Sequence, residues 1–529
     1  MESFDYIVIG GGSAGSAVAG RLAVDGTRRV CLLEAGGRND NVWIKTPGFM
    51  PFIPEKSNYK YETIPQKGLN GRTGYQPRGK GLGGSSAINA MVYIRGNRWD
   101  YDNWAAMGCT GWAYEDVLPY FKRSESNERG GNDFHGVGGP LFVEDQKYAN
   151  PATQAFIDSA AALQLRVNPD FNGEQQDGFG YFQVTQRKGE RWSAARAYVE
   201  PIREQGNFTV RTDTLVEKLV IEAGRVTGVQ IRREGASETL FARRGVVLSA
   251  GAFNSPQILM LSGIGPAQHL KSHGIDVVLD RPAVGNDLQD HIDYVSGWET
   301  ASDVPMGQSA KGLLRMAAAI AEHRLRRTGM MTTCFAEGAG FWRVMPDAPA
   351  PDVQWHFVPA VLEDHGREKV KAHGFSLHAC VLRPESRGTV RLGSADAAAA
   401  PVIDPNYLDD ERDMATLRAG VRLSHRIAEA PPLQAFGPKD RHPVDLNDDA
   451  ALDELIRNRA DTVYHPVGTC RMGADAQAVV DPTLKLNGLE GLWVADASIM
   501  PKIVSGNTNA PSIMIGERCA DFVMAAERA

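Results

Sequence analysis

The sequence predicts an α/β protein of two structural units, and three observations support that prediction. The chain has 529 residues, which is more than one hydrophobic core usually serves. Residues 5–37 read as a buried strand, a glycine-rich turn, a helix and a second buried strand. Residues 297–460 differ in character, with separate strands and amphipathic helices, and glycine-rich buried-strand character returns at 464–529.

This order predicts one unit built from the first, middle and last parts of the chain, with a second unit inserted into it. We expect the first unit to comprise residues 1–155, 206–296 and 464–529. The second should comprise residues 156–205 and 297–463, built on a mainly antiparallel sheet.

The individual elements follow from local patterns. "YIVIG" is an apolar run typical of a buried strand, and "SAGSAVAGRLA" has small residues at helical spacing, which allows close packing on a sheet. Strand alternation with turn residues runs from 206 to 250. Further strands are expected at 352–359 and 375–382, and helices near 312–326, 411–429 and 448–459.

The turn after the first strand carries Gly10-x-Gly12-x-x-Gly15, with Ser13 and Ala14 between the last two glycines. The pattern follows a strand and opens a helix, and Glu34 and Ala35 end the next strand about 20 residues on. In this context it predicts a Rossmann-like dinucleotide site, with the pyrophosphate at the helix N-terminus. Glu34 would accept a hydrogen bond from the adenosine ribose, which disfavours NADP. The pattern does not separate FAD from NAD.

Composition excludes several classes of protein. The net charge of −7 and the lack of a dominant basic run argue against nucleic-acid binding. The six cysteines form no CxxC pair, so we expect no metal site, dithiol centre or disulfide framework. The N-terminus shows no signal peptide, and no apolar stretch could span a membrane. We therefore expect a cytoplasmic protein, or one bound peripherally at the inner membrane.

Two later segments separate FAD from NAD. "RGKGLGGSSAINAMVYIRGNRWDYDNWA" (78–105) and "GAFNSPQILMLSGIG" (251–265) resemble the two signatures of the glucose–methanol–choline oxidoreductases, which are FAD enzymes. The resemblance covers essentially the whole chain, including "YHPVGTCRMG" and "SGNTNAPSIMIGERCAD". Within the family the chain looks closest to bacterial aliphatic-alcohol dehydrogenases of the alkane-oxidation type, and then to choline dehydrogenases.

The resemblance implies that His465 is the general base that takes the hydroxyl proton of an alcohol while hydride moves to flavin N5. An imidazole with a pKa near ~6.5 is suited to that role at working pH. The alternatives are a structural histidine in a Pro-Gly loop, or a metal ligand, for which no partner has suitable spacing. The resemblance also implies that Asn509 donates a hydrogen bond to the alcohol oxygen.

The resemblance implies further FAD contacts. Asn507 and Thr508 would touch the flavin, Asp496 and Ala497 the pyrophosphate and ribityl region, and Val216 the adenine. At the position where some relatives attach the flavin covalently, this chain has Ile88, so non-covalent FAD is expected. The second glycine segment would contribute Gly79, Gly83, Gly84, Ser85, Asn89, Met91 and Val92.

The resemblance thus implies oxidation of a primary alcohol to an aldehyde, with a quinone, a respiratory-chain component or O₂ as electron acceptor. Choline dehydrogenase, an O₂-using alcohol oxidase and a hydroxynitrile lyase that holds FAD without net redox remain alternatives. Neither the alcohol nor the oligomeric state follows from the sequence.

Four features remain open. His269 and His273 have metal-ligand spacing but no carboxylate motif, which favours a solvated helix face. Glu337 could bind a cationic substrate or be structural. Trp355 and Phe357 share one strand face, as pocket lining or as core. Residues 311–327 form a basic amphipathic helix that either packs between domains or docks on a membrane or electron acceptor. Its apolar stripe is Leu313, Leu314, Ala317, Ile320, Ala321 and Leu325, with Arg315, Arg324, Arg326 and Arg327 largely off it.

Overall fold

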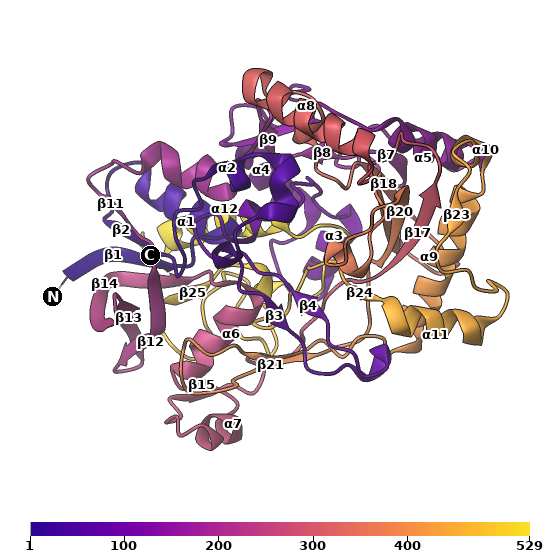
Figure 1. Ribbon diagram of the computed structural model, residues 1–529. Coiled ribbons are helices and arrows are strands. Elements are labelled where there is room, and N and C mark those ends of the chain that lie inside the picture. Colours follow the sequence, from indigo (N-terminus) through magenta and orange to yellow (C-terminus); the bar gives the residue numbers. More distant parts are fainter. Residues whose placement is uncertain (1, 529) are drawn as a thin grey trace.

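The computed structural model describes residues 2–528 and contains two seven-stranded sheets, one in each half of the view in Figure 1. The first sheet has the order β11-β2-β1-β14-β13-β12, and β25 also pairs with β14. The pairings β11–β2, β2–β1, β1–β14 and β14–β25 are parallel, whereas β12, β13 and the start of β14 form an antiparallel meander. The strands are β1 (Glu2–Ile9), β2 (Val30–Leu33), β11 (Phe208–Arg211), β12 (Thr214–Glu222), β13 (Arg225–Arg233), β14 (Ala236–Leu248) and β25 (Leu492–Val494).

Two helices from opposite ends of the chain pack together in the first unit. They are α1 (Ser13–Ala23) and α12 (Asn509–Ala526), which also pass close to each other in Figure 1. Small residues on both helices allow this approach. A Cβ on Gly516 of α12 would lie only 2.4 Å from the carbonyl oxygen of Ala14 in α1. The C-terminal segment therefore belongs to the same unit as the first glycine turn.

The second sheet is antiparallel throughout, as the sequence predicted. Its order is β23-β17-β20-β19-β18-β7, with β24 also pairing with β17. The strands are β7 (Gly178–Tyr181), β17 (Ile292–Thr300), β18 (Gly338–Trp342), β19 (Val353–Val358), β20 (His373–Val381), β23 (Lys439–Asp440) and β24 (Asp461–Thr462).

Helices α5 (Pro151–Ala162) and α9 (Glu411–Ala428) cover one face of this sheet. Trp355 and Phe357 point into that interface: the Trp355 indole donates to Ser424 Oγ at 2.9 Å, and Phe357 stacks on Phe156 at 4.9 Å. Both are fully buried, so they are core residues. His356, between them on β19, lines a cavity on the opposite side.

The structure confirms the α/β fold class but corrects the predicted domain boundaries. Residue 296 falls inside β17, which lies wholly in the second sheet. Residue 155 falls inside α5, which packs on that sheet. Conversely, η5 (Ala195–Val199) packs against α1, although it lies in a segment predicted for the second unit. Local patterns find the elements, but only packing shows to which core an element contributes.

The expected helices near 312–326, 411–429 and 448–459 correspond to α8 (Ala310–Arg326), α9 and α11 (Asp449–Arg459). Between residues 2 and 528, no helix is both long and apolar enough to cross a membrane. Other helices are α2 (Val42–Lys45), α3 (Arg98–Ala106), α4 (Tyr114–Ser124), α6 (Gly251–Leu261), α7 (Ala267–Ser272), α10 (Pro431–Gln434), η1 (Pro47–Phe52), η4 (Gly84–Ala87), η7 (Met330–Thr332) and η9 (Ala497–Ile499). Smaller strands include β3 (Tyr61–Glu62), β4 (Tyr75–Gln76), β5 (Glu125–Asn127), β6 (Leu141–Asp145), β8 (Gln183–Val184), β21 (Thr389–Arg391) and β22 (Val402–Asp404).

Candidate active site

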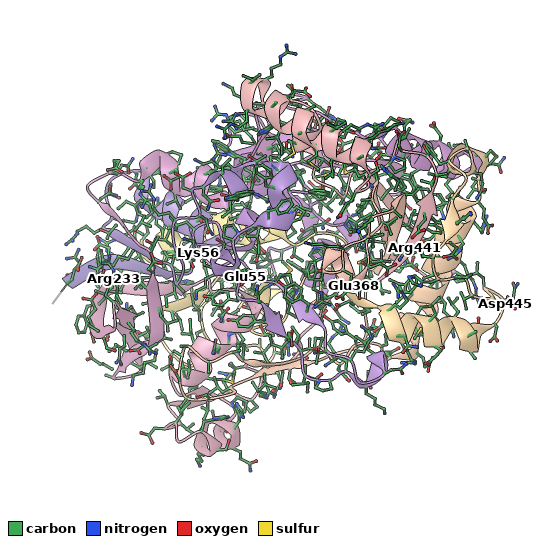
Figure 2. All side chains as sticks on the ribbon, viewed as in Figure 1. Glu55, Lys56, Arg233, Glu368, Arg441 and Asp445 are labelled. Atoms are coloured by element: carbon green, nitrogen blue, oxygen red, sulfur yellow. The ribbon has the colours of Figure 1, made fainter. Side chains whose placement is uncertain are left out.

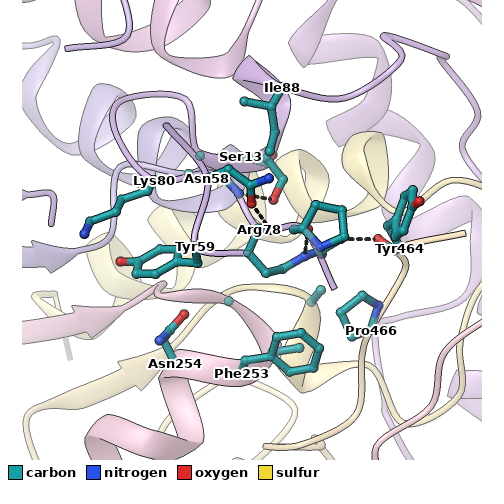
Figure 3. A pocket seen from close by; sticks show the side chains of 18 of the residues that line it. Ser13, Asn58, Tyr59, Arg78, Lys80, Ile88, Phe253, Asn254, Tyr464 and Pro466 are labelled. Atoms are coloured by element: carbon teal, nitrogen blue, oxygen red, sulfur yellow. Dashed lines mark hydrogen bonds between the residues drawn. The ribbon is translucent and has the colours of Figure 1, made fainter. Parts of the chain in front are cut away.

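A cavity of about 990 Å³ is lined by residues of both sheets. One part is lined by the first glycine turn, the end of β2 and Val216 of β12. Another is lined by His356 and Val358 of β19, His378 of β20 and the loop that carries His465. Figure 3 shows side chains around this space, with Arg78 directed at Tyr464, whose carbonyl oxygen it reaches at 2.6 Å.

The first glycine turn has the geometry that its sequence predicts. Gly10 has a φ of +97°, which favours glycine, and a Cβ on Gly15 would lie 1.9 Å from the Gly10 carbonyl oxygen. A Cβ on Gly12 would meet nothing within 4 Å, so its backbone is open on the cavity side at the start of α1. Ser13 and Ala14 also line the cavity. The turn thus offers a helix N-terminus to an anionic ligand.

Glu34 lies at the end of β2 and connects both glycine segments. Its Oε2 accepts the Gly11 N–H, and its Oε1 accepts the N–H groups of Gly36 and Gly81, all at 2.9 Å. Burial raises the pKa of this carboxyl, while those backbone donors oppose the rise. Glu34 and Ala35 line the cavity, so a ribose hydroxyl could reach Glu34. The role of holding two loops together was not predicted from the sequence.

The second glycine segment lies against the first. A Cβ on Gly84 would approach the Gly12 Cα to 2.7 Å, so a side chain there would push the two turns apart. Buried Arg191 fixes Asn89 by donating to its backbone oxygen at 2.6 Å and its side-chain oxygen at 2.9 Å. Five of the FAD contacts predicted in this segment line the cavity: Gly79, Gly84, Ser85, Asn89 and Val92. Ile88, at the position of covalent attachment in some relatives, lines it as well.

Gly83 and Met91 do not belong to that lining. Gly83 has a φ of +92° and packs near Ser193, and Met91 is fully buried beside Val184 and Cys334. Both residues shape the loop beside the cavity, and their contact with FAD stays a prediction. Adjacent residues of a turn point in different directions, which a linear motif does not reveal.

His465 is held by a second histidine. Its Nδ1 lies 2.9 Å from Nδ1 of His291, whose Nε2 lies 3.1 Å from the Leu382 carbonyl oxygen. A carbonyl only accepts, so His291 must carry its proton on Nε2 and accept at Nδ1. His465 must then carry its proton on Nδ1. This leaves a lone pair on His465 Nε2, the nitrogen that faces Asn507.

The backbone of His465 is fixed by Asp290. Asp290 Oδ1 accepts the His465 N–H at 2.8 Å, while Oδ2 accepts from Tyr407 at 2.5 Å and Thr462 at 2.6 Å. Neither Asp290 nor His291 was predicted from the sequence. The only signal was the adjacent "DH" in "LQDHID", and nothing in its spacing pointed to a residue 174 positions away.

The structure corrects the predicted partner of His465. Asn507, not Asn509, lies beside the imidazole: its Nδ2 is 3.1 Å from His465 Nε2, and its Oδ1 accepts from Gln354 at 3.0 Å. The Gln354 contact fixes the amide with its donor toward His465. Asn509 instead accepts from Ser13 Oγ at 2.7 Å, at the first residue of α12. The two asparagines of "GNTNAP" point to different places because the helix begins between them.

Burial makes the imidazoles of the site weak bases. The pKa of His465 lies well below its ordinary value, first because the side chain is desolvated and then because His291, His356 and Arg78 disfavour a positive charge. Burial likewise lowers the pKa of His291 to about 3 and that of His356 to about 4. The sequence expectation of a pKa near ~6.5 is therefore too high. His465 is neutral, and able to accept a proton, over a wider pH range than expected.

The remaining predicted contacts line the cavity. Val216, Ala497 and Thr508 all do so. Asp496 lies there as well and accepts from the backbone N–H groups of Gly251 and Ser498, each at 2.8 Å. It thereby fixes the starts of α6 and η9 at the cavity edge.

Other candidate groups have structural roles. Glu337 is buried away from the cavity lining and accepts from Thr153 at 2.7 Å and Thr333 at 2.8 Å. His269 Nε2 accepts the Leu392 N–H at 3.0 Å, and no cluster of three or more His, Cys, Asp or Glu suited to a metal occurs within the described chain. Cys470 is fully buried, and burial raises the pKa of its thiol, which does not suit a nucleophile.

The cavity residues fit FAD. The open glycine turn at a helix N-terminus suits a pyrophosphate, Glu34 is placed for a ribose, and an unprotonated imidazole nitrogen of His465 faces another part of the same cavity. Fold and site together define a flavin-dependent oxidoreductase. Two models of the GMC oxidoreductase family match residues 4–293 and 384–516, more than half of the chain, so the chain belongs to this family.

Relatives with assigned activities support that membership. The chain is 42% identical to an alcohol dehydrogenase (acceptor) of Pseudomonas putida, covering 98% of this chain and 96% of the relative. It is 41% identical to an oxygen-dependent choline dehydrogenase of Brucella ovis, with 99% and 96% covered. These relatives confirm the sequence-based family assignment and identify the protein as an FAD-dependent alcohol oxidoreductase.

Solved structures agree with the fold. The chain superposes on a pyridoxine 4-oxidase described as from Mesorbium loti with a TM-score of 0.88 and 31% identity, covering 98% of each chain. A formate oxidase gives a TM-score of 0.91 at 27% identity, covering 100% of this chain and 99% of that one.

Proposed function

We propose that this protein oxidises an uncharged primary alcohol to the aldehyde, with His465 as the general base. The observation that supports this most directly is the His291–His465–Asn507 arrangement, which leaves the Nε2 lone pair of His465 facing an amide donor in the cavity. FAD, when bound, supplies the acceptor for the hydride that leaves the alcohol carbon.

The residues of the site have separate roles in this reaction. Nε2 of His465 accepts the hydroxyl proton as the alcohol becomes an aldehyde. Nδ1–H of His465 stays hydrogen-bonded to His291, which keeps the ring oriented. Nδ2 of Asn507 donates to the alcohol oxygen, and Gln354 prevents that amide from turning. Oxygen charge that develops before proton transfer is complete would be stabilised by the same N–H.

The lining near His356 favours an uncharged substrate. It includes Ala336, Val358, Leu362 and Val463, which present aliphatic carbon to the cavity. The carboxylate considered for a cation, Glu337, is engaged by two threonines outside the lining. A choline substrate remains the second candidate, because the choline dehydrogenase of Brucella ovis is nearly as similar as the alcohol dehydrogenase.

Anaerobic flavin reduction tests this proposal. The purified protein is mixed with alkanols, aryl alcohols, glycol ethers or choline, and the loss of flavin absorbance is followed. We expect bleaching by alkanols and, at a lower kcat/KM, by choline. No bleaching by any alcohol, combined with cleavage of a hydroxynitrile, would point to a lyase. Hydrogen peroxide formed in air distinguishes an oxidase from a dehydrogenase that needs a quinone or a respiratory-chain acceptor.

A further inference from the structure

Helix α8 presents an apolar surface to solvent. Leu314 is 72% exposed and Leu325 is 84% exposed, which is unusual for large apolar side chains. From the sequence pattern, the apolar stripe of this helix could pack between domains. The structure instead packs α8 through Met316, Ala319, Ile320 and His323, which are the less exposed residues of the helix. Side chains of α8 project from the upper edge of the molecule in Figure 2.

The solvent-facing residues form a defined strip. Because each residue turns an α-helix by about 100°, positions 314, 318, 321 and 325 share one face, opposite the packed face. They are Leu314, Ala318, Ala321 and Leu325, and all four are exposed. We call this set the α8 strip. It offers a continuous apolar line of side chains to whatever lies outside the helix.

Basic side chains flank the α8 strip on both sides. On a helical projection Arg324 falls on one edge, and Lys311 and Arg326 fall on the other. Residues 311–327 hold five Lys or Arg and one Glu, in a chain whose net charge is −7. Asp303 pairs with Lys311 at 3.4 Å, whereas Arg324 and Arg326 are exposed. An apolar strip between cations complements a negatively charged surface with an apolar interior.

A second apolar feature is linked to α8 through η7. Trp43 of α2 and Phe52 at the end of η1 are 43% and 63% exposed, and their rings are 6.4 Å apart. η1 packs on η7, which in turn packs on α8. Exposed aromatic rings are favoured at the headgroup level of a bilayer. Met50 of η1 also lines the cavity, so the segment that carries Phe52 borders the candidate active site.

We propose that α8 binds peripherally to an anionic lipid bilayer, with the α8 strip in the headgroup–acyl boundary and its flanking arginines against lipid phosphates. This proposal goes beyond alcohol oxidation and does not depend on it. It would bring the cavity next to the phase in which apolar alcohols and quinones concentrate.

Vesicle flotation of the FAD-loaded protein tests the proposal. We compare vesicles of phosphatidylcholine alone with vesicles in which one third is phosphatidylglycerol, at low and high salt. Wild-type protein should float with the anionic vesicles, at least roughly tenfold more than with neutral ones, and less at high salt. Equal flotation with both compositions, or with neither, would contradict the proposal.

Two variants and a matched control test whether the α8 strip and its flanking arginines are the surface that binds lipid. Leu314→Gln/Leu325→Gln should reduce partitioning roughly tenfold or more, and Arg324→Gln/Arg326→Gln should remove most of the anionic preference. The control Val137→Gln/Val278→Gln replaces apolar residues that are 62% and 50% exposed elsewhere, and should float like the wild type. Wild-type flotation of the leucine variant would overturn the assignment to α8.

Two further measurements distinguish lipid binding from misfolding and from dimer formation. All variants should retain the wild-type rate of flavin reduction by a water-soluble alcohol, which shows that their fold and site are intact. A second copy of the chain is the competing occupant of the α8 strip. If light scattering shows a wild-type dimer that the leucine variant splits, and neither protein binds vesicles, then the strip is a dimer interface and the lipid proposal is wrong.

Discussion

At the scale of single residues, the chemistry depends on which nitrogen of His465 carries a proton. The Leu382 carbonyl oxygen fixes the proton of His291 on Nε2, and His291 in turn fixes the proton of His465 on Nδ1. A backbone oxygen two hydrogen bonds away therefore decides which nitrogen of His465 acts as the base. No charged group takes part in this series of hydrogen bonds. It therefore orients the ring without raising its pKa, which burial keeps low.

Replacing the base should separate catalysis from cofactor binding. We expect His465→Ala to retain FAD while flavin reduction slows by roughly 10²–10⁴-fold, because proton acceptance is lost. Both kcat and kcat/KM should fall, since the interaction strengthens only in the transition state. Anaerobic stopped-flow measurement checks this. His273→Gln is the control, on the α7 surface, and should react at the wild-type rate. Near-normal reduction in His465→Ala would remove the histidine from the mechanism.

The two asparagines of "GNTNAP" should behave differently. Asn507→Ala removes the donor beside His465 and should slow reduction by roughly 10–10³-fold. Asn509→Ala removes a hydrogen bond to Ser13 at a helix start and should affect the rate much less. Combined with His465→Ala, the Asn507 change should cost less than the product of the single effects, because both groups act on one oxygen. The opposite ranking of the two variants would restore the sequence-based assignment to Asn509.

The low pKa of His465 sets the expected pH dependence. A base acts in its deprotonated form, and burial moves the loss of that form to a pH below 6.5. The kcat/KM should therefore stay level as the pH falls through 6.5 and decline only at more acidic pH. A pH profile of kcat/KM with a slowly reacting alcohol checks this. A midpoint at or above 6.5 would show that His465 is not desolvated as the structure has it.

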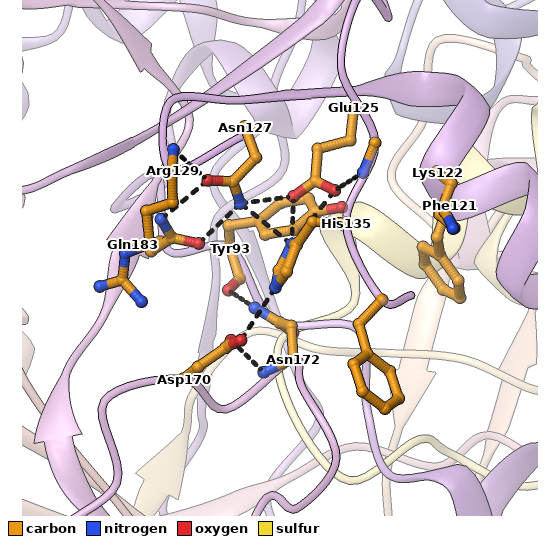
Figure 4. Close-up of polar contacts among 12 residues, drawn as sticks. Tyr93, Phe121, Lys122, Glu125, Asn127, Arg129, His135, Asp170, Asn172 and Gln183 are labelled. Carbon is orange, nitrogen blue, oxygen red and sulfur yellow. Dashed lines mark hydrogen bonds and ion pairs between the residues drawn. The ribbon is translucent and has the colours of Figure 1, made fainter. Parts of the chain in front are cut away.

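At the scale of elements, buried ion pairs hold together segments that the sequence separates. Nη2 of Arg95 lies 2.6 Å from Oε2 of Glu125, and both side chains are buried. The His135 ring lies between Glu125 at 3.1 Å and Asp170 at 3.0 Å (Figure 4). Asn127 joins this group to Gln183 of β8 at 2.9 Å. These contacts tie the loops that carry Arg95, His135 and Asp170 to β5 and β8. Their loss would loosen the second glycine segment, because Arg95 is part of it.

The charge of His135 predicts a pH-dependent stability. Burial alone would lower the pKa of His135, but Asp170 and Glu125 raise it overall. A raised folded-state pKa contributes stability that is present below the unfolded value of about 6.5 and is lost as pH rises through the folded value. His135→Gln should therefore cost roughly 1–3 kcal/mol near neutral or mildly acidic pH, and less at alkaline pH. Thermal melts of both proteins across pH 6–9 check this. A destabilisation that is equal or larger at alkaline pH would contradict it.

At the scale of the whole molecule, the cavity exists only because two sheets meet. Its lining combines Val216 and Glu34 from the first sheet with His356 and His378 from the second. The His465 loop follows β24, the last strand of the second sheet, and leads back to the first unit. FAD bound there would contact both units, so its loss should lower the melting temperature of the entire chain.

The mode of FAD attachment is testable on the same scale. Because Ile88 lines the cavity where a nucleophilic side chain would be needed, FAD should be held without a covalent bond. Acid precipitation should leave the yellow colour in the supernatant, and the recovered apoprotein should melt at a lower temperature than the FAD-loaded form. Colour that stays with the precipitate would defeat the prediction.

The proposed role of His465 came from the family resemblance of its motif, whereas the sequence patterns by themselves determined the two sheets and the glycine turn. These features are local: period-two and helical patterns, and a turn that only glycine can form at Gly10 with its φ of +97°, are written in neighbouring residues. Tertiary structure alone decided which residues meet over long distances. In the folded chain His291 contacts His465, and Asn507 rather than Asn509 lies beside that imidazole. Burial lowers the pKa of the imidazoles, and Leu314 and Leu325 face solvent. Each of these depends on which side of an element faces another part of the chain. A linear pattern does not specify that, because helical and strand periodicity define faces but not their partners.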